Sequence, residues 1–462
     1  MSIEHVPGTA LTYHLIGFDA AGRELPDDPD GPASRGAAAA LAGGGVTDVF
    51  VFAHGWLADL PEARRRYGAW VAAMGRSRAD VELLARRRPG FRPLLVGLHW
   101  PSRPWADGEL DVPDAVASPA AAGSGAWSSA PGDWSPAAAG APLPATKRLV
   151  DAWAEQIADT PAAREALELV AAAAVGGAAG AGRGGEVLDA CLVLDREAGL
   201  GSDGPGAAPG ADREPFRPER LVEAARHRLP PEAGLAGMLA PLRALAYAIA
   251  RQRAHRLGEG PGRRLLAELQ RAARPTTAFH LMGHGFGGTA VSAMLAGDQP
   301  SEVAPVRSLA VVHGTLSAFS YCADNPAAPG RPGCYHRAVD QASVTGPVVV
   351  TRSAGDLVTG WLHPFAAGTG LPAGEPVLGA LPRYGALGAL GARGLGAGSV
   401  DLEVRPAREG YRFQPGQVYN LETSRAVRPG ETLAGAHTDV ARAEVAHAVW
   451  QAALASAAAP GA

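Results

Sequence analysis

A glycine-rich turn inside an apolar segment constrains the fold of this chain more than any other feature of its sequence. The segment FHLMGHGFGGTAVSAML, residues 279–295, contains four glycines between Gly283 and Gly288. The residues before these glycines are apolar, as in a buried strand, and the residues after them have the composition of a buried helix. Glycine permits positive φ angles and a close approach between backbones. The segment therefore predicts a strand-to-helix turn.

This turn supports two interpretations. The spacing G-x-G-x-x-G from Gly283 is typical of a dinucleotide-binding turn. The pentapeptide GHGFG, residues 283–287, is instead a nucleophile elbow, Gly-x-Ser-x-Gly, with Gly285 at the serine position. A dinucleotide turn normally follows the first strand and is paired with an acid at the tip of the next one. Several strands are expected before this turn, and the strand that follows it ends at His313 without an acidic residue at its tip. We therefore favour the elbow and keep a nicotinamide-dependent enzyme as a minor alternative.

Apolar runs rich in β-branched residues occur in two blocks of the sequence. They are nearly continuous rather than alternating, which is typical of strands covered on both faces in a parallel sheet. Because they alternate with helix-like segments, the sequence predicts an α/β fold with a mainly parallel, twisted sheet flanked by helices. The expected strands are at 11–19, 46–56, 93–102, 276–284, 308–314 and 346–356, and the expected helices are at 61–88, 146–175, 218–257 and 261–273.

A long interval of different composition separates the two blocks. Stretches rich in Ser, Pro, Gly and Ala at 106–144 and 199–215 predict mobile loops, and helical patterns follow each of them. We therefore expect a large helical and low-complexity insertion that acts as a cap on an α/β core. The expected division is 1–104 for the N-terminal part of the core, 105–260 for the cap and 261–462 for the C-terminal part of the core.

Three further features follow the order that a nucleophile elbow requires. Upstream, an apolar run ends in His54-Gly55-Trp56, and the N–H after such a His-Gly pair is suited to an oxyanion hole. Downstream, a strand-like run leads to Asp356, and His437 precedes a C-terminal helical segment. The order of elbow, Asp and His is the order found in α/β-hydrolases.

These motifs together resemble the α/β-hydrolase superfamily and, more narrowly, a poorly characterised bacterial group of large hydrolase-like proteins. The narrower resemblance also includes GLHWPS at 97–102, GPVVVT at 346–351 and AHTD at 436–439, so it covers most of the chain outside the insertion. It implies an α/β-hydrolase fold and an esterase-like ancestry. The residues that it implies are Gly285, Asp356 and His437 for the catalytic set, Trp56 and Phe286 N–H for the oxyanion hole, and His54, Gly55, Gly283, His284 and Gly287 for the surrounding motif.

Gly285 departs from the family pattern, because glycine provides no nucleophile. It is nevertheless the residue best suited to a strained turn with positive φ. We therefore expect a pseudoenzyme or a very weak hydrolase that binds a small acyl or apolar ligand, or a partner. The alternative is a serine hydrolase of esterase type in which Gly285 is an inactivating substitution. We expect His284 to pack or hydrogen-bond beside the turn, and Thr289 to be a structural hydroxyl.

Composition narrows the function classes further. The formal charge of −4 and the scattered arginines give no nucleic-acid surface. Three cysteines favour a reducing compartment, no secretory signal is found, and no run is long and apolar enough to span a bilayer, so we expect a cytoplasmic protein without a membrane partner. No cofactor or metal is expected. The histidines at 99, 313, 336 and 363 lack the close spacing of metal ligands and are expected to be ordinary polar or semi-buried residues.

Overall fold

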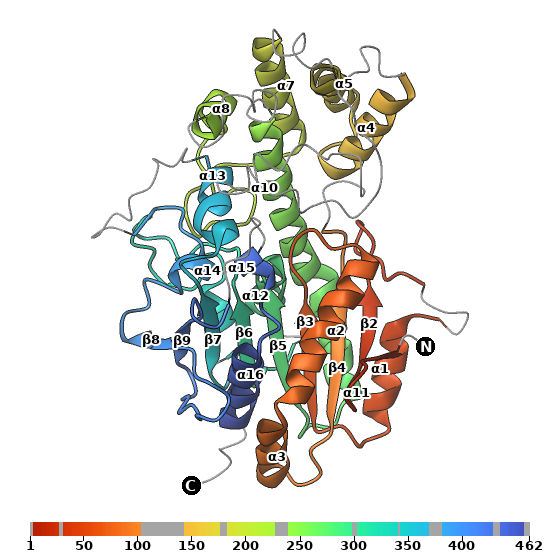
Figure 1. Ribbon diagram of the computed structural model, residues 1–462, viewed down its shortest axis with the longest axis vertical. Helices are drawn as coiled ribbons and strands as arrows, with labels where there is room; N and C mark the ends of the chain where they lie inside the picture. Colours follow the sequence, from red (N-terminus) through yellow and green to blue (C-terminus); the bar gives the residue numbers. More distant parts are fainter. Residues whose placement is uncertain are drawn as a thin grey trace.

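A nine-stranded sheet forms the centre of the molecule (Figure 1). This computed structural model describes residues 3–26, 31–102, 143–175, 183–226, 239–297, 303–340, 342–368, 381–427 and 435–456. The strands are β1 (Ile3–His5), β2 (Thr12–Gly17), β3 (Asp48–Ala53), β4 (Pro93–His99), β5 (Ala278–His284), β6 (Ser308–Val312), β7 (Val348–Arg352), β8 (Ser399–Glu403) and β9 (Val418–Glu422). Their order in the sheet is β1-β2-β4-β3-β5-β6-β7-β9-β8.

The sheet is almost entirely parallel, as expected from the continuous apolar runs. β1 is antiparallel to β2, and the other neighbouring pairs of the described sheet are parallel. In β3, Val49 and Val51 face one apolar cluster, while Phe50 and Phe52 face another on the opposite side of the sheet. Both faces of the strand are therefore buried, and its sequence contains no alternation.

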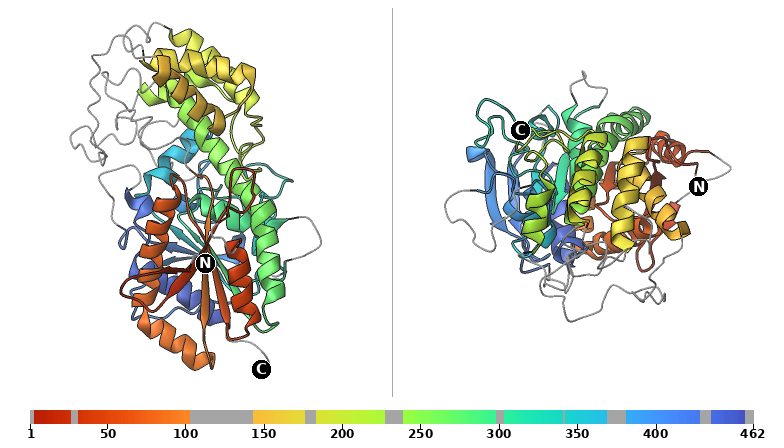
Figure 2. Two further views of the ribbon diagram at one scale, coloured as in Figure 1. Left: turned by 90° about the vertical axis from the view of Figure 1, so that its right-hand side faces the viewer. Right: turned by 90° about the horizontal axis from the view of Figure 1, so that it is seen from above.

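Helices cover both faces of this sheet (Figure 2). On one side lie α1 (Ala33–Ala42), α10 (Ala240–Leu257), α11 (Arg263–Ala272) and α12 (Phe286–Ala296), and on the other lie α2 (Leu60–Arg76), α3 (Arg78–Arg87) and α16 (Ala443–Ser456). The α/β class expected from the sequence is therefore confirmed. The single helix expected at 61–88 is divided, because the chain leaves helical geometry at Ser77.

The helices between 143 and 226 are α4 (Leu143–Gln156), α5 (Pro161–Val175), α7 (Gly184–Glu197) and α8 (Pro218–Arg226). The first three pack with α10 around an apolar cluster of their own, whereas Leu221 and Ala225 of α8 belong to the cluster on the sheet. The expected helix at 146–175 is interrupted, because Thr160 Oγ1 accepts a hydrogen bond from Ala163 N and starts a new helix. These helices lie beyond the end of the sheet at which the parallel strands finish (Figure 1). None of the described helices combines the length and apolar character of a membrane-spanning segment.

Helix α10 joins the two apolar regions. Leu245 and Ile249 belong to the cluster of α4, α5 and α7, whereas Tyr247 and Ala250 belong to the cluster on the sheet. The helix is consequently buried around most of its circumference. Seven shorter helical segments complete the described chain: η3 (Gly258–Gly262), η4 (His336–Val339), η5 (Val358–Leu362), α13 (His363–Ala366), α14 (Leu387–Leu390), η6 (Gly396–Gly398) and α15 (Gly435–Thr438).

The stretch 199–215 differs from the mobile loop that its composition predicts. Pro205, Asp212 and Arg213 are buried, and Arg251 on α10 donates from Nη2 to the Asp212 carbonyl oxygen at 3.1 Å. The segment is therefore folded against the rest of the molecule. Of the other predicted loop, 106–144, residues 106–142 lie outside the described residues. The division into 1–104, 105–260 and 261–462 remains a prediction.

Candidate functional site

Gly285 lies between β5 and α12, in the strand-to-helix turn that the sequence predicts. Its φ and ψ are 55° and −119°, and this positive φ favours glycine over residues with a Cβ. Gly285 N donates to the carbonyl oxygen of Val312 at 3.0 Å, and Gly288 N donates to that of Gly285 at 3.0 Å. These bonds tie the turn to β6 and to the first turn of α12.

Close backbone approach accounts for the neighbouring glycine at 287. A Cβ atom added at Gly287 would lie 1.9 Å from the Ala53 carbonyl oxygen, at the end of β3. A Cβ added at Gly285 would lie 3.5 Å from the Cα of Gly55. The loop that follows β3 is therefore placed beside the turn, as expected for the His54-Gly55-Trp56 motif.

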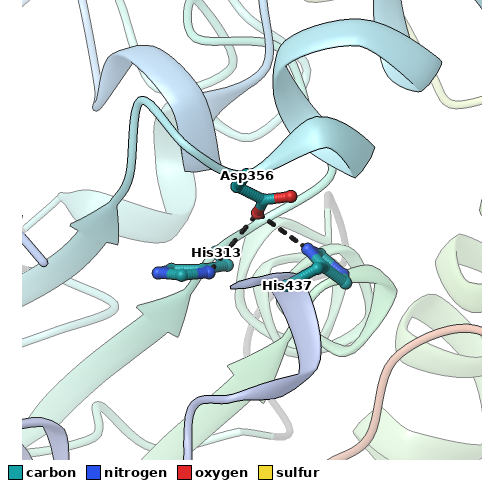
Figure 3. Close-up of side chains that lie close together, drawn as sticks. All are labelled: His313, Asp356 and His437. Carbon is teal, nitrogen blue, oxygen red and sulfur yellow. Dashed lines mark hydrogen bonds and ion pairs between the residues drawn. The ribbon is translucent and has the colours of Figure 1, made fainter. Parts of the chain in front are cut away.

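Asp356 and His437, which are far apart in the sequence, form a hydrogen-bonded pair (Figure 3). His437 Nδ1 lies 2.8 Å from Asp356 Oδ2. The second carboxylate oxygen, Oδ1, accepts from Val358 N at 2.9 Å and from Thr359 N at 3.2 Å, at the start of η5. Asp356 is thereby held in place by backbone groups, and His437 is positioned by Asp356.

The protonation state of Asp356 fixes the direction of this hydrogen bond. Burial alone would raise the pKa of Asp356, but the adjacent imidazoles of His437 and His313 hold it well below its usual value. Asp356 is therefore a carboxylate and accepts from His437 Nδ1–H. In the neutral imidazole, the other nitrogen of His437, Nε2, is then an acceptor.

The acceptor nitrogen of His437 lies at the Gly285 position. A Cβ atom added at Gly285 would be 2.8 Å from His437 Nε2. His437 is 4% exposed, and its Nε2 has no hydrogen-bond partner among the described residues. The structure thus brings Gly285, Asp356 and His437 together, as the sequence predicts, with the imidazole occupying part of the space that a side chain at 285 requires.

His284 holds the backbone of the His437 loop. Its Nε2 lies 2.7 Å from the His437 carbonyl oxygen, which can only accept, so Nε2 carries the proton. Burial, and after it the neighbouring imidazole of His437, lower the pKa of His284 well below its usual value, so it is neutral. The structure therefore gives His284 the hydrogen-bonding role expected from the sequence.

His54 is the first residue of the loop after β3, and its side chain is buried. Its Nδ1 is 2.8 Å from the Gly55 carbonyl oxygen, and its Nε2 is 3.1 Å from His99 Nδ1. Burial, together with His99, lowers the pKa of His54 well below its usual value. His54 and His99 therefore form a neutral, buried pair that shapes this loop.

Three aromatic side chains pack together beside the turn. The ring of Tyr247 on α10 lies 5.2 Å from that of Trp56 and 4.9 Å from that of Phe286, measured between ring centres. The hydroxyl of Tyr247 is 3.3 Å from His363 Nδ1. Helix α10 thus contacts both residues whose N–H groups are expected to form the oxyanion hole. Convergence of these two N–H groups on one point remains a prediction.

His313 is the residue of this site that the sequence analysis missed. The sequence predicts an ordinary polar or semi-buried residue, but His313 is fully buried directly after β6, with Nδ1 3.3 Å from Asp356 Oδ2 (Figure 3). Its Nε2 lies 2.9 Å from Thr423 Oγ1. The sequence feature that could have identified His313 is its place directly after an expected strand. This strand, β6, is parallel to β5, so both end at the same edge of the sheet.

The three side chains of Figure 3 are also of the types that bind metal ions. Their donor atoms lie within 4.8 Å of one another. However, the 2.8 Å between His437 Nδ1 and Asp356 Oδ2 is a typical charge-assisted hydrogen bond. Two ligands of a tetrahedral zinc ion with bonds of about 2.0 Å lie about 3.3 Å apart. The short distance between His437 and Asp356 therefore favours a hydrogen-bonded pair.

A cavity of about 80 Å³ lies behind the His437 loop and is lined by Phe52, Tyr67, Trp70, Met282 and His284 among others. A second cavity, of about 440 Å³, lies at the other end of α12, near Ala296 and Tyr335. Neither cavity includes Gly285 in its lining.

In comparisons with known proteins, no family model, no curated protein and no solved structure matches this chain.

Proposed function

We propose that this chain has an α/β-hydrolase fold and binds an ester-like or acyl ligand at a hydrolase site that lacks its nucleophile. One observation carries the proposal: His437 Nε2 lies 2.8 Å from the position of a Cβ at Gly285 and has no partner among the described residues. In a serine hydrolase, this nitrogen takes the proton of the attacking serine. The chain order of Gly285, Asp356 and His437 gives further support.

The chemistry left to such a site is limited. Without a serine hydroxyl, His437 Nε2 can only accept a hydrogen bond from a ligand or remove a proton from water. The backbone N–H groups of Trp56 and Phe286 would polarise a bound carbonyl. Hydrolases without their nucleophile retain an acceleration of about 10³ to 10⁴ over water from the oxyanion hole and binding. Ligand binding with slow or no turnover follows.

The helices between 143 and 257 would act as a cap in this proposal. Ligands of open α/β sheets bind at the carboxyl ends of the strands, where these helices lie (Figure 1). Tyr247 contacts Trp56 and Phe286 there. A cap in this place would limit ligand size and exclude water from the site.

The decisive experiment is Gly285→Ser, assayed with a short-chain aryl ester. We expect hydrolysis to rise by orders of magnitude, because a serine Oγ would lie beside the acceptor nitrogen of His437. A Cβ at this position would be only 2.8 Å from Nε2, so the imidazole must first withdraw by several tenths of an ångström. We therefore expect a lower kcat than that of a natural serine hydrolase.

Two controls isolate the effect of the hydroxyl. Gly285→Ala adds the Cβ without Oγ and should give no gain, and His437→Ala in the Gly285→Ser background should abolish the gain. A large gain also favours the alternative of an esterase-type serine hydrolase inactivated at Gly285. If Gly285→Ser folds but hydrolyses no ester, thioester or amide faster than the parent chain, the hydrolase proposal is wrong.

A further inference from the structure

We propose that protonated His447 clamps residues 404–410 onto the C-terminal helix α16, and that this segment opens when His447 loses its proton. The segment follows β8 and precedes β9, outside the site described above, so the inference does not depend on the proposed function. Its basis is a buried carboxyl group on α3, that of Asp80, from which two side chains of α16 reach the chain between β8 and β9.

Two hydrogen-bonded relays run in parallel from Asp80 through α16. In the first, Asp80 Oδ2 lies 2.7 Å from His447 Nδ1, and His447 Nε2 lies 3.0 Å from the carbonyl oxygen of Glu409. In the second, Asp80 Oδ1 accepts from Gln451 Nε2 at 2.8 Å, and Gln451 Oε1 accepts from Tyr411 N at 3.1 Å. His447 and Gln451 are four residues apart and so lie on one face of the helix. Helix α16 thus joins α3 to the chain around Glu409 and Tyr411.

The first relay requires two protons on the ring of His447. The Glu409 carbonyl oxygen can only accept, so His447 Nε2 carries one proton. A second proton must lie between His447 Nδ1 and Asp80 Oδ2, because two lone pairs at 2.7 Å would repel each other. This proton belongs to the ring, since imidazole is a stronger base than a carboxylate. His447 is therefore an imidazolium ion paired with the Asp80 carboxylate.

The surroundings of His447 stabilise this cation. Burial by itself would lower the pKa of His447, but the hydrogen bonds to Asp80 and to the Glu409 carbonyl oxygen raise it above the usual value, and the charges of Asp80 and Glu444 add to this effect. The other charged or titratable groups near this part of the described chain are Tyr411, whose ring lies 5.5 Å from that of His447, Arg405 over the Tyr411 ring, and Arg408, which is 3.8 Å from the Glu409 carboxylate.

Loss of one proton breaks the two relays unequally. The proton that remains on His447 stays on Nδ1, because a carboxylate is a stronger acceptor than a carbonyl oxygen. The lone pair of Nε2 then faces the Glu409 carbonyl oxygen, and this contact becomes repulsive. The relay through Gln451 contains no titrating proton, so Tyr411 remains bound to α16.

The opening is confined to one side of Tyr411. Phe413 is buried against Tyr419, Ala448 and Ala452, which fixes the chain that leads into β9. Glu409 and its neighbours from 406 to 410 are exposed, and the Glu409 carbonyl oxygen is their contact with His447. The segment 404–410 therefore loses a contact with α16 as His447 is deprotonated, while α16 itself stays on α3.

NMR of the histidine side chains in the parent protein tests the charge. We expect both ring nitrogens of His447 to be protonated below its titration midpoint, and this midpoint to lie above the usual value of about 6.5. His447→Gln assigns the resonances by their loss. Asp80→Asn removes the charge but keeps an oxygen acceptor, so it should lower the midpoint, and it assigns the same resonances if His447→Gln does not fold. A midpoint at or below about 6.5 would overturn the proposal.

Amide hydrogen exchange tests the opening. The amides of Arg405 and Glu409 are hydrogen-bonded, to Tyr411 Oη at 2.7 Å and to the Pro406 carbonyl oxygen at 2.9 Å, so their protection can be followed. After correction for the intrinsic effect of pH, their exchange should accelerate by about tenfold or more across the His447 midpoint, because a hydrogen bond to a charged group is worth at least that factor. The Tyr411 amide is the internal control and should stay protected. Unchanged protection of Arg405 and Glu409 would overturn the clamp even if His447 is cationic.

Stability measurements give an independent check with a defined sign. Because the pKa of folded His447 is raised, its stabilisation is fully present below the usual histidine pKa of about 6.5 and is lost as pH rises through the folded pKa. The urea midpoint of the parent should therefore exceed that of His447→Gln most at about pH 6, and the difference should shrink by about pH 9. A difference that is constant or grows with pH would contradict the proposal.

Discussion

At the scale of residues, histidines organise the site. His437 carries the acceptor nitrogen next to Gly285, His313 contacts Asp356 from a second direction, and His284 holds the His437 backbone. Each lies at the end of a strand or in a short helix at the same edge of the sheet. The backbone therefore fixes these rings before any ligand binds.

We expect His284→Leu to destabilise the site. It removes the donor to the buried His437 carbonyl oxygen, now at 2.7 Å, and should lower the free energy of unfolding by about 1 to 3 kcal/mol. His284→Gln is the matched control, because its amide can donate over a similar reach. Urea unfolding measures both. Equal stability of the Leu and Gln variants would contradict the role of this hydrogen bond.

At the scale of elements, the junction of β3, β5 and α12 controls how closely strand and helix approach. Its glycines are required by contact as well as by backbone angle, since a Cβ at Gly287 would overlap the carbonyl group of Ala53. The loop after β3 and the turn after β5 are placed together by this contact. The oxyanion-hole prediction for Trp56 and Phe286 depends on that placement.

Gly287→Ala tests this packing. The added methyl group would lie 1.9 Å from the Ala53 carbonyl oxygen, so β3 and α12 must separate, and we expect a loss of about 3 kcal/mol or more in the free energy of unfolding. Gly68→Ala in α2 is the control, because its Cβ would meet nothing within 4 Å and alanine favours the helix by about 1 kcal/mol. Urea unfolding should show opposite shifts for the two variants. A stable Gly287→Ala variant would contradict the close approach.

At the scale of the whole molecule, buried neutral histidines connect stability to pH. Burial lowers the pKa of His54, His284 and His363 well below the usual value. The pKa of four further histidines is also lowered, namely His14, His99, His255 and His280. Three groups among the described residues act in the opposite direction in this pH range. Burial raises the pKa of Asp195 and raises that of Asp212 to about 6, and Asp80 raises the pKa of His447 despite its burial.

We therefore expect the free energy of unfolding to fall as pH falls below about 6.5. The unfolded chain then binds protons that the folded histidines exclude, and each such histidine contributes roughly 1.4 kcal/mol per pH unit at the steepest. This stabilisation is fully present above the unfolded pKa. Urea unfolding at constant ionic strength between pH 8 and 5 measures it. Unchanged or greater stability at pH 5.5 than at pH 7.5 would contradict the expectation.

The sequence by itself determined the features that depend on local pattern and chain order. Continuous apolar runs predicted six strands of the parallel sheet, because strands covered on both faces contain few polar residues. The glycine spacing predicted the turn at Gly285. The order of Gly285, Asp356 and His437 predicted their meeting, since parallel strands all end at one edge of the sheet.

Only the tertiary structure decided the rest. The strands β1, β8 and β9 were not predicted. β1 and β8 are short edge strands with exposed residues, whereas β9 is buried but its short apolar run is interrupted by Asn420. The segment 199–215 is loop-like in composition, yet the distant Arg251 holds it against the molecule. The contact of His313 with Asp356 depends on the pairing of β6 with β7 and on a single positive φ, and neither leaves a periodic signal in the sequence.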